Sequence, residues 1–198
     1  MNDYRIIDNL PFGYNFQTKT VRELRNYQAW FIENKSYRLK ELNNLVINTP
    51  GLDNWEMDFT PNSLIGLWNC LQENITSEPL SKEKYESLQS SVPAEIHVND
   101  YELTTRSISI LVDAGIYIGD VLIHNHPDLR WEQYPSRTRN DANYGHMVIV
   151  ISKNHWVNPI RAMYNIGLKI INHQCGTNSI LKLYDFWSSS VNISALSR

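Results

Sequence analysis

The most hydrophobic stretch of the chain is TTRSISILVDAGIYIGDVLI, residues 104–123. Apolar side chains recur every three or four residues from Ile108 to Leu122, and further apolar residues occupy the other faces. A helix that is apolar nearly all round is a buried helix. The sequence therefore predicts one buried central helix over 104–123 that ends near Asn125, because Pro127 disfavours a helical conformation at the residue before it. A strand at 116–123 is the alternative, since a short apolar run fits both structures.

Two glycines, Gly115 and Gly119, lie four residues apart in this stretch and share one face of the expected helix. In a helix interior, each glycine costs about 1 kcal/mol relative to alanine. We therefore expect another element to pack closely against each of them.

The rest of the chain is expected to be mostly helical, with strands between residues 129 and 152. Helices are expected at 20–32, 37–47, 62–74, 158–176 and 180–187, with a short one beginning near Ser81. Strands are expected at 129–134 and 146–152, which alternate or are rich in β-branched residues. The predicted fold class is α+β: mostly helical, with one long buried central helix packed against a small antiparallel sheet.

Length and composition favour a single globular domain over 1–198. The chain is 42% hydrophobic and 20% charged, which excludes disordered and fibrous classes. Within this domain the sequence predicts an extended N-terminal arm at 1–19, a mobile connection at 77–93 and a polar C-terminal tail at 188–198.

Composition also excludes several partners and compartments. A net charge of −3 gives no basic footprint for nucleic acid. No apolar run reaches the roughly 20 residues of a membrane span, and the N-terminus lacks the pattern of a signal peptide. Cys70 and Cys175 are too few for a disulfide framework, so both are expected to be buried thiols. We expect a cytoplasmic protein that binds neither nucleic acid nor a membrane; the sequence does not indicate its oligomeric state.

A candidate binding surface follows the predicted central helix. Within fifteen residues the chain gathers charged, polar and aromatic side chains, namely Asp120, His124, Asp128, Arg130, Trp131, Glu132 and Tyr134. Aromatic and arginine side chains dominate binding hot spots, and segments held by a rigid scaffold often carry function. The alternative is that Trp131 and Tyr134 are packed in the sheet while the charges form a solvated rim.

One short motif suggests chemistry instead. His124-Asn125-His126-Pro127 resembles the His-x-His-Pro element of JAMM-type zinc isopeptidases. The resemblance implies that both histidines bind zinc, that a downstream serine and aspartate follow, and that an upstream glutamate activates the zinc-bound water. The downstream candidates are Ser136 and Asp141, and the upstream ones are Glu95 and Glu102.

The spacing of this motif departs from that family. Nine residues separate His126 from Ser136 and four separate Ser136 from Asp141, and both gaps are longer than the family's. If 104–124 is helical, His124 lies on the last turn and His126 beyond it, pointing elsewhere. The zinc-dependent hydrolase therefore remains the alternative hypothesis, and the favoured one has no cofactor, no metal and no catalytic residue.

A broader resemblance spans residues 20–190. It rests on Tyr27-Gln28-Ala29-Trp30-Phe31, on the segments 58–64 and 113–120, on Trp131 and on the strand at 147–151. With these features the chain resembles a group of uncharacterised small bacterial proteins akin to the immunity proteins of toxin–immunity systems. The resemblance implies a non-enzymatic cytoplasmic binding protein that neutralises a cognate toxin, and it assigns no functional residue.

Overall fold

The central element of the fold is α4 (Thr105–Asn125) in the computed structural model, which describes residues 4–10, 15–93, 95–136 and 138–196. The helix begins after Thr104, whose hydroxyl oxygen accepts a hydrogen bond from the backbone N–H of Ser107 at 3.1 Å. Fourteen of its 21 residues are buried. The predicted central helix and its end near Asn125 are confirmed, and the alternative strand at 116–123 is wrong.

By length and composition alone, α4 is apolar enough to cross a membrane. Within the structure, however, 78% of its most apolar window is buried by the surrounding elements. Such burial is typical of the core helix of a globular protein.

Both glycines of α4 face a closely packed neighbour, as predicted. A Cβ atom on Gly115 would lie 2.6 Å from the Cα atom of Ile160, at the start of α5 (Pro159–Ile171). A Cβ atom on Gly119 would lie 2.2 Å from Cζ2 of Trp131, in β3 (Trp131–Gln133). These contacts explain why α4 tolerates two helix-weakening residues.

Helices α1 (Val21–Ile47), α5 and α6 (Ser179–Leu196) pack against α4, and α2 (Ser63–Asn74) packs against α1, α4 and α6. The prediction of two helices at 20–32 and 37–47 is wrong, because α1 continues through the polar residues between them. Asn34 donates from Nδ2 to the carbonyl oxygen of Trp30 at 2.9 Å, and Lys35 pairs with Asp120. These contacts satisfy the polar side chains without breaking the helix.

The last helix, α6, is longer than the expected helix at 180–187. It includes most of the segment predicted to be a polar tail at 188–198, whose final two residues lie outside the described ones. The serines fit a helix because their hydroxyls turn back to the previous turn: Ser189 donates to the carbonyl of Asp185 at 2.8 Å, and Ser190 to that of Phe186 at 2.9 Å.

A three-stranded antiparallel sheet covers one side of α4 near its C-terminal end. Its strand order is β3–β4–β5, with β4 at Met147–Ser152 and β5 at His155–Val157. Trp131 pairs with Ile149 in the register, and both side chains reach Gly119 of α4. The predicted strands at 129–134 and 146–152 are confirmed in shortened form, β5 was not predicted, and the α+β fold class is confirmed.

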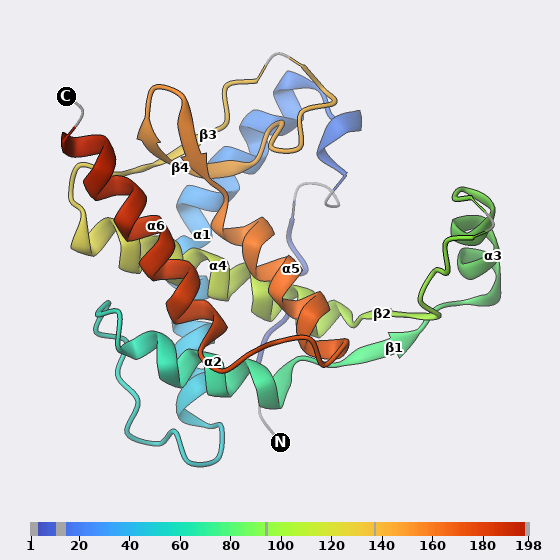
Figure 1. The fold of residues 1–198 in the computed structure, drawn as a ribbon, viewed down its shortest axis with the longest axis horizontal. Coiled ribbons are helices and arrows are strands. Elements are labelled where there is room, and N and C mark those ends of the chain that lie inside the picture. The colour runs from blue at the N-terminus through green and yellow to red at the C-terminus, as the bar shows by residue number, and fades with distance from the viewer. Residues whose placement is uncertain (1–3, 11–14, 94, 137, 197–198) are drawn as a thin grey trace.

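An arm of residues 77–103 projects from the body of the molecule (Figure 1). It consists of β1 (Ser77–Pro79), α3 (Lys82–Ser90) and β2 (Tyr101–Leu103), with β1 and β2 paired antiparallel. None of the residues of α3 is buried. The segment 77–93, predicted to be a connection, thus contains a strand and a helix of its own.

The described residues of the predicted arm at 1–19 lie on the body of the molecule. Tyr4 and Ile7 are buried, and the N–H of Ile7 donates to the hydroxyl of Ser109 on α4 at 3.0 Å. A short 3-10 helix, η1 (Phe16–Thr18), precedes α1 and buries Phe16. Residues 1–3 and 11–14 of this predicted arm lie outside the described residues.

Candidate functional site

Four of the seven predicted surface residues line one open pocket of about 420 Å³ at the C-terminal end of α4. They are Asp120, His124, Arg130 and Trp131. The lining is completed by Lys35, Phe59, Ile123 and Leu129. We call this the helix-exit pocket.

Asp120 is fully engaged inside this pocket. Its carboxylate accepts from Nζ of Lys35 at 2.7 and 2.9 Å, and from Nε1 of Trp131 at 2.8 Å. The side chain of Asp120 is 12% exposed and that of Lys35 31%. Because its charge is neutralised and its oxygens are occupied, Asp120 positions Trp131 and is not a free acid or base.

The rings of Trp131 and Tyr134 pack against other aromatic rings and are not fully exposed. The Trp131 ring lies 5.0 Å from that of Phe31 between centroids and covers Gly119, and the Tyr134 ring meets Trp156 edge-on at 5.2 Å. Both side chains are half-buried. They fit the alternative interpretation of sheet packing, so Trp131 forms the floor of the pocket and Tyr134 lies outside its lining.

The exposed residues of the predicted set are His124, Asp128 and Arg130. Arg130 forms an ion pair with Glu132, and the Arg130 side chain is 70% exposed. Asp128 and Glu132 do not line the pocket, although both lie on the chain that leads to it. Arg130 and His124 are therefore the groups that another molecule would meet first.

Phe59 completes the pocket, although the sequence pattern does not single it out. Its ring stacks on that of His124 with centroids 5.8 Å apart and planes at 27°. Its φ of 57° lies in the left-handed region, which is rare for a bulky residue. Nδ2 of Asn125 donates to its carbonyl oxygen at 3.0 Å and helps to hold it there. Its only sequence signal is its position directly before Thr60-Pro61, which marks a helix start.

The two histidines of the His-x-His-Pro motif have separate partners. His124 stacks on Phe59, whereas Nε2 of His126 lies 2.8 Å from the hydroxyl oxygen of Ser188 on α6. Residues 121–125 are helical, so the strand that would turn both rings to one face does not form. Among the described residues, no three His, Cys, Asp or Glu side chains lie close enough together to hold a metal ion.

The upstream glutamates proposed for that motif are also remote from it. Glu102 belongs to β2 and pairs with Lys84, and Glu95 lies in the same projecting arm. The arm joins the N-terminal end of α4, and a helix of 21 residues is about 30 Å long. Neither glutamate reaches the histidines at the opposite end.

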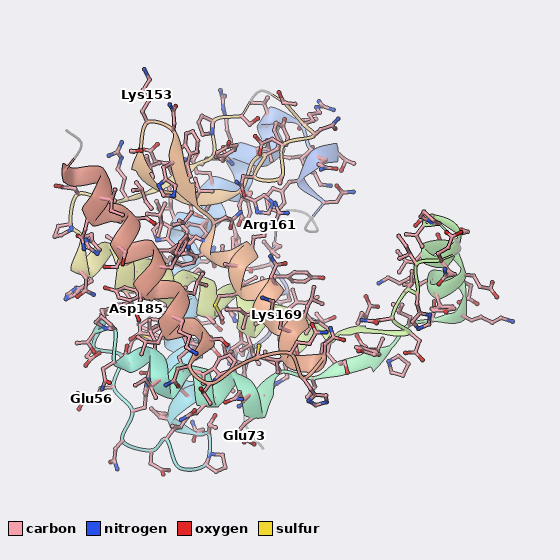
Figure 2. All side chains as sticks on the ribbon, in the orientation of Figure 1. Glu56, Glu73, Lys153, Arg161, Lys169 and Asp185 are labelled. Carbon is pink, nitrogen blue, oxygen red and sulfur yellow. The ribbon has the colours of Figure 1, made fainter. Side chains whose placement is uncertain are left out.

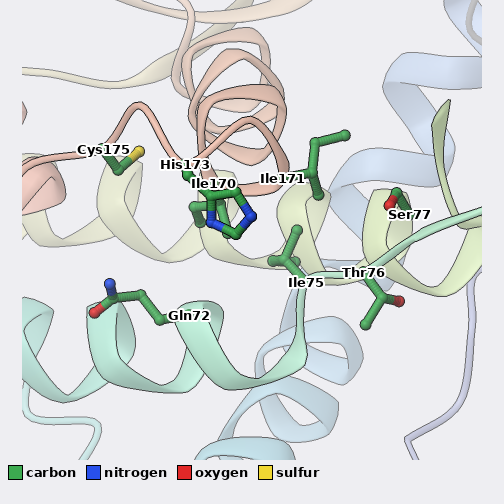
Figure 3. A pocket seen from close by; sticks show the side chains of 8 residues that line it. All are labelled: Gln72, Ile75, Thr76, Ser77, Ile170, Ile171, His173 and Cys175. Atoms are coloured by element: carbon green, nitrogen blue, oxygen red, sulfur yellow. The ribbon is translucent and has the colours of Figure 1, made fainter. Parts of the chain in front are cut away.

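A cleft of about 600 Å³ between the end of α2 and the connection from α5 to α6 holds Cys175 and His173 (Figure 3). Burial raises the pKa of the Cys175 thiol, whose sulfur lies 3.8 Å from the carbonyl oxygen of Ile166. A raised pKa keeps the thiol protonated at neutral pH, unlike the thiolate of a catalytic cysteine. Cys70 is fully buried, as expected, while Cys175 is only half-buried.

The helix-exit pocket thus combines an exposed guanidinium, an exposed imidazole and an aromatic ring over a packed floor. Within the lining that the structure describes, no nucleophile is paired with a base. This arrangement suits contact with another molecule's surface. Comparison of the chain with protein-family models, with curated proteins and with solved structures finds no match.

Proposed function

We propose that the chain is a non-enzymatic cytoplasmic binding protein whose partner is another protein. The observation that carries this proposal is the helix-exit pocket, where Arg130 and His124 stand exposed beside Phe59. Arginine and aromatic groups contribute most to the energetic centres of protein interfaces. The buried helix α4 and the Lys35–Asp120–Trp131 contacts fix the floor of the pocket beneath these groups, so the floor needs little ordering when a partner binds.

An immunity role is the most specific form of this proposal. A protein that neutralises a toxin needs a rigid surface that covers the toxin's own site, and it needs no catalytic set. The resemblance to immunity proteins over residues 20–190 motivates this form, and the partner is then a cognate bacterial toxin.

The projecting arm supports the same function. Residues 77–102 contain six carboxylates and two lysines, a net charge of −4, whereas the whole chain carries −3. Leu88 and Ile96 of this arm are 39% and 52% exposed. Partly exposed apolar side chains on an acidic background fit a partner with a basic surface.

The test begins with the full chain purified from its native cells together with its bound protein. That protein is identified and expressed alone and together with the chain. We expect growth inhibition by the partner and relief by the wild-type chain. We also expect reduced relief by a His124→Ala/Arg130→Ala variant.

The matched control is Lys169→Ala, which removes an exposed cation near the opposite end of α4 (Figure 2). It should relieve growth inhibition as well as the wild type does. If the partner is not toxic, the immunity role is excluded and the binding role stands. Recovery of no protein partner would contradict both.

A further inference from the structure

A second cavity lies beside the first half of α4, two helical turns before the helix-exit pocket. It has a volume of about 500 Å³ and is enclosed by α4, α5, η1 and the loop that precedes β4. Pockets that bind small molecules have volumes of about 300–1,000 Å³ and are mostly apolar with a few well-placed polar groups. The described lining of this cavity has that character.

The floor of the cavity is apolar because α4 and α5 meet there. Ile108, Leu111 and Val112 of α4 and Ile160 of α5 form it. The two helices touch at Gly115 and Ile160, and again where Leu111 covers Gly167. Since close contacts on the neighbouring turns hold both helices, the floor is fixed by the core and not by loops.

The rim of the cavity carries one charge. Arg161 donates from Nη1 to the carbonyl oxygen of Ala142 at 2.8 Å, which holds the side chain against the loop. No carboxylate of the described residues lies within 4.0 Å of its guanidinium nitrogens. Its other N–H groups are therefore available, and a guanidinium binds a carboxylate through two parallel hydrogen bonds.

The remaining rim groups are neutral. His146 stacks on Phe16 with centroids 3.9 Å apart, and burial, together with the nearby charge of Arg161, lowers its pKa to about 4. The imidazole is therefore uncharged at neutral pH and offers one donor and one acceptor. Tyr164 is 41% exposed and Gln17 lies on the facing side, from η1. The described lining thus carries one positive charge above an apolar floor.

We propose that this cavity binds a small amphipathic anion, with its apolar body on the isoleucine and leucine floor and its carboxylate on Arg161. This site is separate from the partner-binding surface and goes beyond the function proposed above. The described linings of the two sites share no residue.

Fluorescence titration of the full chain with anilinonaphthalenesulfonate tests this proposal, because that probe has an aromatic body and one anionic group. We expect saturable binding at one site per chain. Arg161→Gln should raise the dissociation constant at least about tenfold, the change expected when a charged hydrogen-bonded group is lost. Ala142→Trp, at an exposed position on the rim, should fill the entrance and abolish binding.

Two controls separate this site from adventitious dye binding. Lys169→Gln removes a cation of α5, the helix that carries Arg161, at a position outside the cavity. It should leave the dissociation constant of the anionic probe unchanged. The uncharged probe N-phenylnaphthylamine should bind more weakly and be insensitive to Arg161→Gln. The proposal is overturned if the anionic probe shows no saturable binding, or if folded Arg161→Gln and Ala142→Trp variants both bind it as the wild type does.

Discussion

Arg38 of α1 and Asp113 of α4 form a buried ion pair at the centre of the molecule. Nε of Arg38 donates to Oδ1 of Asp113 at 2.9 Å, and Nη2 donates to Oδ2 at 2.7 Å. The exposed fractions of the two residues are 2% and 0%. The Tyr4 hydroxyl donates to the same carboxylate and accepts from Nη2 at 2.7 Å. One polar network thus joins the N-terminal segment to two helices.

Removing only the cation of this pair should be severely destabilising. Arg38→Met leaves the Asp113 carboxylate buried without its partner, and such a loss costs about 3–5 kcal/mol of unfolding free energy. Arg38→Met/Asp113→Leu removes both charges and should recover at least half of that loss. Urea denaturation measures both variants. If Arg38→Met loses less than about 1 kcal/mol of unfolding free energy, the pair does not hold these elements together.

Enlarging Gly119 should strain the contact between α4 and the sheet. Gly119→Leu places a side chain where Trp131 and Ile149 already lie, and overpacking of this kind costs about 1–3 kcal/mol. Gly176→Leu is the control, because a Cβ atom there meets nothing within 4 Å. Thermal unfolding should show a lower melting temperature for the first variant and almost none of that decrease for the second.

His146 should make the chain less stable in mild acid. Its pKa is about 4 in the folded chain and about 6.5 when unfolded, so the unfolded chain binds more protons between these values. Its contribution to stability is complete above pH 6.5 and is lost as the pH falls toward 4, by up to about 3 kcal/mol. His146→Gln cannot titrate there, so the difference in unfolding free energy between variant and wild type should change with pH in this window. A constant difference contradicts the assignment.

The central part of the fold could be predicted from the sequence because local signals agree there. Thr104 caps α4, apolar residues repeat with helical spacing, and Pro127 follows its end. The positions of Gly115 and Gly119 also forecast the close approach of neighbours. Each of these signals lies within or next to the element that it predicts.

Other features depend on contacts between distant residues, which periodicity does not contain. Lys35, in the polar stretch that α1 crosses, pairs with Asp120, 85 residues away, and Arg38 is buried against Asp113, 75 residues away. Phe59 joins the helix-exit pocket through a left-handed backbone conformation that its residue type does not suggest. The projecting arm looked like a linker because its helix lacks an apolar face, and that helix buries none of its residues.

Substitutions at two neighbouring residues of the helix-exit pocket should change the free energy of unfolding by very different amounts. Trp131→Ala opens a space beside Phe31 and Gly119 and removes the hydrogen bond to Asp120, so we expect a loss of about 3 kcal/mol. Arg130→Ala removes an exposed side chain and should change stability by less than about 0.5 kcal/mol. Chemical denaturation measures both. A large loss for Arg130→Ala would mark it as a structural residue.

The affinity of the purified partner protein for the Arg130→Ala variant, measured by isothermal titration calorimetry, tests the central claim most directly. The proposed interface predicts a dissociation constant about 30-fold above that of the wild-type chain, which corresponds to about 2 kcal/mol, with an unchanged melting temperature. Lys169→Ala should bind as the wild type does. Unchanged affinity in both Arg130→Ala and His124→Ala would contradict the claim that the helix-exit pocket binds the partner.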